Sequence, residues 1–547
     1  MIEAWKHGTD MKIVVLGTGY VGLVSGVCFA AWGHDVTCVD QDTAKIDLLR
    51  VGSAPFYEPR LQDLLKETAL AGKITFASSL VDSTKEASLV FVAVGTPPSV
   101  IDGAADLSQV FAAAEEIANT AKSGTVIVLK STVPVGTCDR VQLLVANIRG
   151  QDDVSVISNP EFLREGSAVA DFMNPNRVVV GTENPEARRL MLEAYQPLID
   201  RNVPFVFTQR RTSELIKYAS NAFLATKIAF INEMSNLCEK VGADIADVSL
   251  GMGLDGRIGP AFLNVGPGYG GSCFPKDTLA LLKVAREHDV ELGLVKETVT
   301  ANTTRKVQMA NRMASMLGNE VAGKTIAVLG LSFKANTDDI RESPALALIE
   351  GLKAMGAKVQ AYDPAAILQA KKVLADVEFY SDVYSCAKGA EGLVVATEWE
   401  EFKHLDFAKL RKVMIGNALL DLRNIVDAAS AIIEGFIVDR LGYVRANELQ
   451  VDQSPGGAGG GTVKPDRTRA CLKSEEKNDE KANDDTDCST GHVALRNERR
   501  SGKTRSTHKS AEHDPTGSQA DLCLSHLEVG KWGCLFRSQR KFLCCFW

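Results

Sequence analysis

"MKIVVLGTGYVGLVSGVCFAAWGHDVTCVD", residues 11–40, is the most informative stretch of this chain about its fold. Its order of apolar residues and glycines predicts a buried strand over 12–16, a tight turn, a helix, and a second strand over 35–39 that ends in an acid. A strand–turn–helix–strand unit of this kind predicts a parallel sheet that is covered by helices.

The glycines of the turn follow the spacing GxGxxG, at Gly17, Gly19 and Gly22. Gly17 permits the turn, Gly19 lets a pyrophosphate approach the backbone, and Gly22 lets the helix pack closely on the strand. The N-terminus of the helix attracts phosphate. Asp40, at the end of the second strand, would bind both ribose hydroxyls and repel a 2′-phosphate. The predicted cofactor is therefore NAD rather than NADP.

Strands and helices continue to alternate beyond this unit. Further strands are expected within four segments: 88–98, 124–137, 154–168 and 177–182. The alternation predicts a doubly wound parallel sheet, whose ligands lie beyond the carboxyl ends of the strands. Three polar segments stand at such ends: Gly95-Thr96, Ser131-Thr132 and Asn159-Pro160-Glu161.

The pattern then becomes helical, and a second α/β unit follows. Residues 213–242 have apolar positions at three- and four-residue steps and no proline, which predicts one long helix. Such a helix often joins two domains and supplies a dimer face. From 323 to 364 the strand–turn–helix–strand layout returns, but Gly330 is followed by Leu-Ser-Phe-Lys and the phosphate fingerprint is lost. This lobe is predicted to bind something other than a dinucleotide.

The predicted fold class is α/β, with two doubly wound Rossmann-like domains joined by a long central helix and followed by a disordered tail. The expected bounds are 11–209 for the NAD-binding domain, 210–310 for the helical dimerisation region with the catalytic loop, 320–450 for the second Rossmann-like domain, and 451–547 for the tail. The tail has a glycine-rich linker, then blocks of acids and bases with almost no apolar residues, and such composition cannot form a core.

Composition limits the partners and the compartment. The chain has 547 residues, 45% of them hydrophobic and 24% charged, which is typical of a soluble globular protein. A net charge of −8 argues against general nucleic-acid binding. Neither a membrane-spanning apolar run nor a signal-peptide core is present, so no membrane contact and a cytoplasmic location are expected. The cysteines up to Cys386 are widely spaced, so no metal is expected and most are interpreted as core filling.

One cysteine is an exception because of its neighbours. "GPGYGGSCFPKD", residues 266–277, places a single thiol in a glycine-rich loop beside a lysine and an aspartate. This setting is closer to that of a reactive thiolate than of a buried small hydrophobe. Three i,i+4 pairs could each project from one face of a helical turn: Glu161/Glu165, Lys217/Asn221 and Cys273/Asp277. Beside an NAD fold, they predict an enzyme that makes and breaks a covalent carbonyl adduct.

From residue 11 to about 447 the chain resembles the UDP-glucose/GDP-mannose dehydrogenase family. The resemblance is carried, in order, by "GTGYVG", "VGTPP", "KSTVPVGT", "NPEFLREGSA", "SELIKYASNAFLA", "GPGYGGSCFPKD" and "SFKANTDDIRESP". It implies oxidation of the C6 alcohol of a nucleotide sugar to a carboxylate, with two NAD and one water. The loop around the thiol is closer to the UDP-glucose branch than to the GDP-mannose branch, so conversion of UDP-glucose to UDP-glucuronate is expected.

The resemblance implies six catalytic residues: Cys273, Lys217, Asp277, Asn221, Thr132 and Glu161. Cys273 would attack the C6 aldehyde, giving a thiohemiacetal and then a thioester that water hydrolyses. Lys217 and Asn221 would stabilise the developing oxyanion. Asp277, with Thr132, would position and deprotonate water. Lys217 and the lysine three residues after the thiol are expected to lower the pKa of Cys273.

The resemblance also implies two binding sets. For NAD the matches are Gly17, Gly19, Tyr20, Val21, Gly22, Asp40, Lys45, Thr96, Thr132, Glu165, Lys276 and Arg341. For the UDP-sugar they are Glu161, Phe162, Leu163, Arg164, Lys217, Asn221, Arg257, Phe262, Leu263, Asn264, Val265, Gly266, Gly270, Lys334 and Arg423. Arg257 would reach the substrate of a neighbouring subunit, which implies at least a homodimer. Lys334 and Arg423 would make the second lobe the UDP-binding domain, since paired cations match a diphosphate.

One departure and three alternatives remain. Arg60 stands in "YEPRL" where the family has a small residue, and it is expected on a loop surface with little effect on catalysis. A GDP-mannose 6-dehydrogenase is the nearest alternative. A single-step NAD-dependent hydroxyacid dehydrogenase would leave Cys273 and the second lobe unexplained. An NAD-sensing or scaffold protein would require a broken site, whereas Cys273, Lys217, Asn221 and Asp277 are all present.

Overall fold

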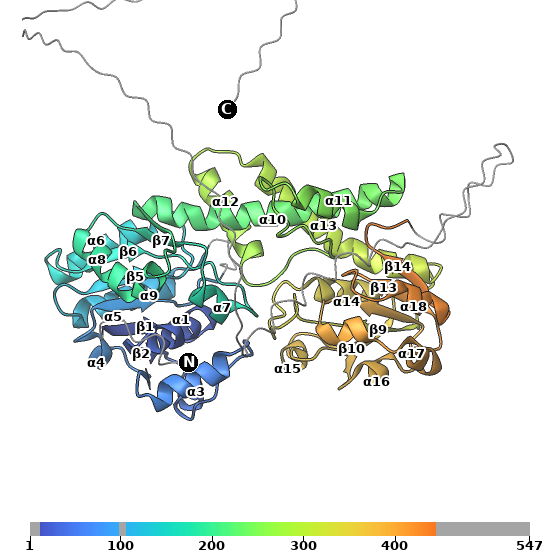
Figure 1. The fold of residues 1–547 in the computed structure, drawn as a ribbon, viewed down its shortest axis with the longest axis horizontal. Coiled ribbons are helices and arrows are strands. Elements are labelled where there is room, and N and C mark those ends of the chain that lie inside the picture. Colours follow the sequence, from blue (N-terminus) through green and yellow to red (C-terminus); the bar gives the residue numbers. More distant parts are fainter. Residues whose placement is uncertain (1–10, 98–104, 445–547) are drawn as a thin grey trace, which may run out of the picture. The chain divides into compact units, whose positions relative to one another are not determined.

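The computed structural model describes residues 11–97 and 105–444. These fall within one compact unit, 1–455. They form two sheets, one of eight strands and one of six, each with its own helices (Figure 1). The segment 451–547, which the sequence predicts to be a disordered tail, lies outside the described residues.

The first sheet has the strand order β3-β2-β1-β4-β5-β6-β7-β8. Its strands are β1 Lys12–Leu16, β2 Asp35–Val39, β3 Ile74–Ala77, β4 Leu89–Val92, β5 Val126–Leu129, β6 Ser155–Ser158, β7 Val178–Gly181 and β8 Phe205–Thr208. β1 and β2 have the bounds that the sequence predicts. β4, β5, β6 and β7 lie inside the four segments expected to hold strands.

One junction in this sheet differs from the prediction of parallel strands throughout. β7 runs antiparallel to β6, through the pair Ser158–Gly181, while β7 and β8 are parallel to each other. A parallel connection requires a crossover over a face of the sheet. Residues 159–177 instead begin at the carboxyl end of β6, and β7 starts from that same edge. The segment that carries Glu161 and Glu165 therefore stays beside the strand ends.

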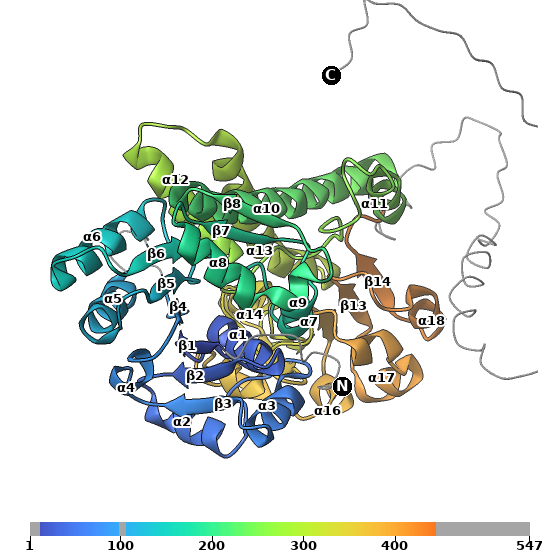
Figure 2. The same cartoon turned by 60° about the vertical axis from the view of Figure 1, so that its left-hand side comes forward.

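Helices cover both faces of this sheet (Figure 2). α1 packs with α3 and α7 on one face, over a core of aromatic side chains that includes Phe29, Trp32, Phe172 and Tyr195. α5 packs with α4 and α6 on the other face, over a second apolar cluster. The helices are α1 Tyr20–Ala31, α2 Thr43–Arg50, α3 Leu61–Leu70, α4 Val81–Thr84, α5 Ser108–Thr120, α6 Thr137–Arg149, α7 Ala168–Met173, α8 Pro185–Ala194 and α9 Gln196–Ile199.

The long helix predicted over 213–242 is α10, Arg210–Val241. It ends at Gly242, whose positive φ of 75° is the left-handed conformation that glycine favours at helix ends. α10 contacts β6, β7 and α6, and also α11 Ile245–Gly253, α12 Phe274–Glu287 and α13 Gly293–Met316. It therefore connects the first sheet to the helices that carry the glycine-rich loop.

The second sheet has the order β11-β10-β9-β12-β13-β14, and all its pairs are parallel. Its strands are β9 Thr325–Leu329, β10 Lys358–Tyr362, β11 Val377–Phe379, β12 Gly392–Val395, β13 Ala418–Asp421 and β14 Ile437–Arg440. Its helices are α14 Pro344–Ala354, α15 Ile367–Ala370, α16 Val383–Ala387, α17 Phe407–Val413 and α18 Ala428–Ile433, with a 3₁₀ turn at Glu400–His404.

The second lobe keeps the layout of the first but uses its acid differently. Asp363, after β10, corresponds in position to Asp40 after β2. One carboxylate oxygen of Asp363 accepts hydrogen bonds from the amides of Leu331 and Ser332, and the Trp399 indole donates to the same oxygen. Asp363 is 1% exposed. This acid is therefore occupied inside the lobe, in line with the loss of the phosphate fingerprint.

Arg60 is exposed, as expected from its loop position. Its φ of 67° lies in the left-handed region, immediately before α3. A residue with a Cβ atom costs about 1 kcal/mol or more there, whereas glycine does not. The backbone therefore explains why a small residue suits this position.

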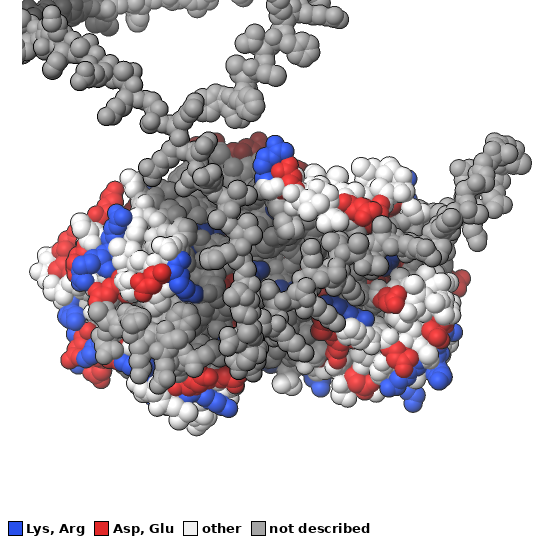
Figure 3. Space-filling model, viewed as in Figure 1, with Lys and Arg blue, Asp and Glu red and all other residues white. Residues whose placement is uncertain are grey.

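Charges of both signs are interspersed on the described surface that Figure 3 presents. None of the helices in the described ranges is both long and apolar enough to cross a membrane.

Candidate active site

A cavity of about 1330 Å³ lies at the carboxyl edge of the first sheet. The glycine turn, the ends of the parallel strands, α12 and the segment 341–342 line it. Eleven of the twelve residues expected to hold NAD are on its wall: Gly17, Gly19, Tyr20, Val21, Asp40, Lys45, Thr96, Thr132, Glu165, Lys276 and Arg341. The twelfth, Gly22, packs beneath the turn.

The turn fits a dinucleotide. A Cβ atom on Gly22 would lie 1.9 Å from the carbonyl oxygen of Gly17, so only glycine allows α1 to approach the strand here. Around a Cβ atom on Gly19 there would be nothing within 4 Å, so this position is open on the cavity side. Asp40 accepts hydrogen bonds from the amide and hydroxyl of Thr18, at 2.8 and 2.7 Å, which fixes its carboxylate at the cavity wall. These features match those that hold the pyrophosphate and the ribose in dinucleotide sites.

A buried ion pair joins α10 to the loop after β6. The Lys217 ammonium donates to Glu161 Oε1 at 3.0 Å, and both side chains are less than one-tenth exposed. Burial by itself would raise the pKa of Glu161, but Lys217 and the Leu163 amide hold that pKa below its ordinary value. Burial would likewise lower the pKa of Lys217, but Glu161 and then Cys273 and Asp277 raise it. Both groups are therefore charged at neutral pH.

A second polar group joins α10 to α12. Asn221, one turn after Lys217, donates to Asp277 Oδ2 at 2.6 Å, and Lys276 donates to Asp277 Oδ1 at the same distance. Asp277 is 1% exposed. Both oxygens of this buried carboxylate are thus held by donors that the sequence singled out. The pairs Lys217/Asn221 and Cys273/Asp277 share the faces of helical turns that the sequence indicates.

The predicted pair Glu161/Glu165 is not on a helical turn, because 159–164 is irregular loop. Glu58 holds this loop: its carboxylate accepts from the amides of Gly166 and Ala168, both at 2.7 Å, and it is 5% exposed. Glu161 and Glu165 diverge as a result. Glu161 pairs with Lys217, whereas Glu165 accepts from the Ser272 hydroxyl at 2.8 Å.

Cys273 is the residue at the N-terminal cap of α12, and the amide of Asp277 donates to its carbonyl oxygen. Burial raises the pKa of the Cys273 thiol to about 11, and the Glu161 and Asp277 carboxylates add to that effect. Lys217 and Lys276 oppose it without overcoming it. The expectation of a lowered pKa was therefore wrong for the free chain, because the desolvation of the thiolate outweighs the two lysines.

Glu165 lies where three segments meet. Its carboxyl faces Ser272 from the glycine-rich loop, and Asp339 and Arg341 from the second lobe, with Arg341 at 3.6 Å. Burial and the Asp339 carboxylate raise the pKa of Glu165 to about 8. Its Oε2 atom is buried and has no hydrogen-bond partner among the described residues. A polar atom of this kind on the cavity wall is available to a ligand.

The residues expected to bind the UDP-sugar are divided between three places. Glu161 and Leu163 line the cavity. A second group consists of Gly266, Arg423 and Lys334. The Arg423 guanidinium packs against Gly266, where an added Cβ atom would lie only 3.2 Å from it. The same guanidinium donates to the carbonyl of Phe333, the neighbour of Lys334. Phe262 and Tyr269 flank Phe274, the neighbour of Cys273, with ring centroids 6.0 Å apart in each pair.

Two cations predicted to bind the UDP-sugar lie outside these three places. Arg257 is 89% exposed and pairs with Asp255, and Arg164 pairs with Asp171. Neither lines the cavity. Of the remaining residues predicted to bind the substrate, Phe162 lies against Lys217, whose ammonium is 5.3 Å from the centroid of the Phe162 ring. Leu263, Val265 and Gly270 are buried, and Asn264 is exposed.

Sequence reasoning missed two residues of this site. Glu58 fixes the loop of Glu161 and Glu165, and Lys130 lines the cavity while being 4% exposed. Lys130 opens the motif "KSTVPVGT", so a lysine directly after an apolar strand was the available signal. Nothing in "YEPRL" indicates that its glutamate would reach residues more than one hundred positions away.

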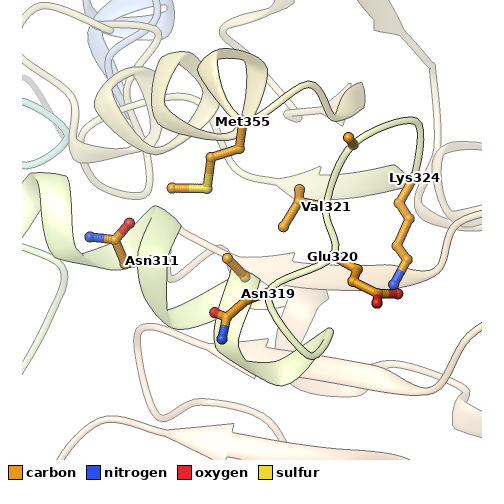
Figure 4. Close-up of a pocket in the computed structure, with 8 residues that line it drawn as sticks. Asn311, Asn319, Glu320, Val321, Lys324 and Met355 are labelled. Atoms are coloured by element: carbon orange, nitrogen blue, oxygen red, sulfur yellow. The ribbon is translucent and has the colours of Figure 1, made fainter.

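A smaller cavity of about 520 Å³ lies between the end of α13 and the start of the second lobe (Figure 4). Asn311, Asn319, Glu320, Val321, Lys324 and Met355 are among the residues that line it. None of them belongs to the predicted site residues.

A dinucleotide cradle beside a thiol and two buried carboxylate–cation groups is the arrangement of a dehydrogenase. Three domain models of one family match the chain. They are the NAD binding domain over 11–199, the central domain over 211–304 and the UDP binding domain over 327–428. The chain therefore belongs to the UDP-glucose/GDP-mannose dehydrogenase family.

Individual relatives agree with this membership. A UDP-glucose 6-dehydrogenase of Rhizobium meliloti (strain 1021) is 51% identical over 434 residues, covering 79% of this chain and 99% of the relative. The structure of a UDP-glucose dehydrogenase from Pyrobaculum islandicum matches with a TM-score of 0.72 at 37% identity, covering 78% of this chain and 97% of that one. The structure of a UDP-D-ManNAc dehydrogenase from Pyrococcus horikoshii matches with a TM-score of 0.70 at 28% identity, covering 79% of this chain and 99% of that one.

The raised pKa of Cys273 predicts slow alkylation of its thiol in the free protein. Iodoacetamide reacts with the thiolate, so the rate at Cys273 should still be rising at about pH 10, roughly tenfold for each pH unit. Peptide-resolved mass spectrometry measures that rate, and the buried Cys138 serves as the unreactive control. A rate that levels off below about pH 8 would show that Cys273 is already a thiolate at neutral pH.

Proposed function

We propose that this chain oxidises the C6 alcohol of UDP-glucose to the carboxylate of UDP-glucuronate, with NAD as the acceptor. The observation that carries the proposal is the placement of Cys273. This thiol lies on the wall of the dinucleotide cavity together with Glu161 and Lys276. These two residues are bonded to Lys217 and Asp277, and all four charges act on the thiol. The names of the relatives in Rhizobium meliloti and Pyrobaculum islandicum support the same activity.

The reaction comprises two oxidations and one hydrolysis. When bound, NAD accepts a hydride from the sugar carbon in each oxidation. C6 first loses a hydride and its hydroxyl proton to become an aldehyde. The sulfur of Cys273 then adds to C6, and the thiol proton moves to the oxygen. Loss of a second hydride and that proton leaves a thioester, and water replaces sulfur. One UDP-glucose, two NAD⁺ and one water give UDP-glucuronate, two NADH and three protons.

The buried charges suit these steps. Lys217, Lys276 and Lys130 bring three positive charges to the site, against the two carboxylates of Glu161 and Asp277. The surplus positive charge stabilises an oxyanion on C6 and a transient thiolate. Since burial raises the pKa of the Cys273 thiol to about 11, its proton must be removed during the attack. We assign Asp277, held by Asn221 and Lys276, to carry that proton to the C6 oxygen and to deprotonate the hydrolytic water, which Thr132 would help to position.

The identity of the sugar rests on sequence rather than on fold. The two solved relatives act on different UDP-sugars by name, yet their TM-scores are 0.72 and 0.70. The 51% identity with a UDP-glucose 6-dehydrogenase favours UDP-glucose over GDP-mannose. A single-step hydroxyacid dehydrogenase would need neither Cys273 nor the second lobe. We assign UDP to that lobe, through Lys334 and Arg423, and NAD to the first.

A cytoplasmic location is part of the proposal. The six cysteines among the described residues are free, which suits a reducing compartment. Cys273 can also act as the nucleophile only while its thiol is reduced.

The stoichiometry of NADH tests the activity directly. The chain should form two NADH for each UDP-glucose consumed, because one carbon is oxidised twice. In Cys273→Ser the second half of the reaction should slow by at least about a thousandfold, because an alkoxide leaves far less readily than a thiolate. Absorbance of NADH and quantification of UDP-glucuronate measure both quantities. Cys238→Ser, at a buried cysteine away from the cavity, is the matched control.

The alternatives give different results in the same assay. One NADH per substrate, with a hydroxyacid and not with UDP-glucose, would point to the single-step dehydrogenase. Reduction with GDP-mannose alone would move the chain to the other branch of the family. Full activity in Cys273→Ser would remove the thiol from the mechanism.

We also propose that α10 forms the interface of a homodimer. Phe223, Phe230, Leu237 and Val241 are 67, 44, 53 and 65% exposed and repeat at steps of seven and four. At 3.6 residues per turn they form one apolar stripe. Lys217 and Asn221 occupy the buried side of the same helix. A second copy of the chain is the partner that would cover the stripe, and we assign the exposed Arg257 to contact with that neighbouring subunit.

Phe230→Glu tests this interface. A charge in the centre of a buried apolar stripe should dissociate the dimer, since central aromatic side chains dominate interface energies. Light scattering after size exclusion should change from at least twice the chain mass to the 58.9 kDa of one chain. Leu70→Glu, at an isolated leucine that is 89% exposed, should leave the mass unchanged. A wild-type chain that is monomeric at micromolar concentration would contradict the proposal.

A further inference from the structure

Lys130 is a buried cation to which the steps above assign nothing beyond its positive charge. It follows β5 directly, lines the large cavity and is 4% exposed. Its ammonium donates to Asn159 Oδ1 at 3.2 Å and reaches the Tyr195 hydroxyl at 3.5 Å. Among the described residues no carboxylate lies within ion-pair distance of it. Burying a lysine without a carboxylate partner has a large free-energy cost, so a compensating interaction is expected.

The structure places that interaction at Glu161. Asn159, which accepts from Lys130, stands two residues before Glu161 in the loop after β6. Its amide group donates to the Val179 carbonyl on β7, and Tyr195 donates to its side-chain oxygen at 2.9 Å. Lys130 therefore fixes the start of the segment that carries Glu161. Lys130 and Glu161 also act on each other electrostatically, each favouring the charged form of the other.

We propose that Lys130 is a positioning residue of the oxidation site, which holds the Asn159–Glu161 segment and keeps the Glu161 carboxylate ionised beside Lys217. The role in oxidation rests on the proposed function, whereas the coupling between Lys130 and Glu161 does not. An ionised Glu161 keeps Lys217 charged and oriented toward the thiol. Without Lys130 the pKa of Glu161 would be higher, so the carboxylate would already be protonated at a less acidic pH and would then no longer hold the Lys217 ammonium.

Three titratable groups face the Glu161 carboxylate. Lys217 approaches from α10 and Lys130 from the end of β5, and both favour the carboxylate, while Cys273 approaches from α12. Burial lowers the pKa of Lys130 to about 8, and the charge of Lys217 adds to this effect. Lys130 is therefore still mostly protonated at neutral pH, and its loss removes a positive charge.

Lys130→Met tests the proposal, because methionine fills the same space without charge. The protonated-carboxyl band of Glu161, assigned in the infrared spectrum by its absence in Glu161→Gln, should titrate at a pH higher by about one unit than in the wild type. The acidic limb of kcat against pH should move by the same amount, with about a tenfold loss of kcat below both midpoints and little change in KM. Lys130→Arg should restore most of the shift.

Two further variants keep the test decisive. Asn159→Asp retains Lys130 and the shape of the site but adds a negative charge, so it should shift the band in the same direction. This variant replaces Lys130→Met if that one fails to fold. Lys122→Met, at an exposed lysine that donates only to a backbone carbonyl, should shift nothing. An unchanged titration of Glu161 in Lys130→Met or Asn159→Asp would overturn the coupling. A shifted band in a chain that does not oxidise UDP-glucose would instead refute the proposed function alone.

Discussion

The Lys217–Glu161 ion pair is the interaction on which the rest of the site depends. It crosses from α10 to the loop after β6, at the edge where the strands of the first sheet end. Two charges are buried together there, and breaking such a pair leaves one of them without a partner at a cost of about 3–5 kcal/mol. The pair therefore fixes the rotation of α10 relative to the sheet. That rotation also sets Asn221 against Asp277, and it places Phe223 and Phe230 on the opposite side of the helix.

The same edge explains why two lobes and a long helix are needed. Parallel strands bring their carboxyl ends together, so Gly17, Thr96, Thr132 and Glu161 share one wall although they are far apart in the chain. α12 adds Cys273 and Lys276 to that wall, and the second lobe adds Arg341. Contacts also link the two lobes directly: the Tyr20 hydroxyl donates to Asp338, and Glu165 faces Asp339. A cofactor on the glycine turn and a nucleotide on the second lobe would therefore meet at the thiol.

Most of the fold could be predicted from local patterns. The GxGxxG spacing between two apolar strands predicts that a helix packs closely on the first strand. The absence of proline over 213–242 allows one long helix. The antiparallel β7 could not be predicted, because periodicity gives the strand but not the direction from which it starts. The i,i+4 spacing predicts that Asn221 shares a helix face with Lys217, whereas its hydrogen bond to Asp277 on another helix depends on the packing of α10 against α12. The anchor of the 161–168 loop by Glu58 likewise depends on contacts between distant segments. The pKa of Cys273 could not be predicted, because the sequence shows the nearby lysines but not the degree of burial.

The proposed mechanism requires a covalent intermediate on Cys273. Acid quenching during turnover with UDP-glucose, followed by peptide mass spectrometry, detects such an intermediate. We expect a UDP-glucuronyl thioester on the peptide of residues 266–277 and on no other cysteine peptide, formed only when NAD is present. An unmodified Cys273 during turnover that yields two NADH, or an adduct on a different residue, would rule out this intermediate.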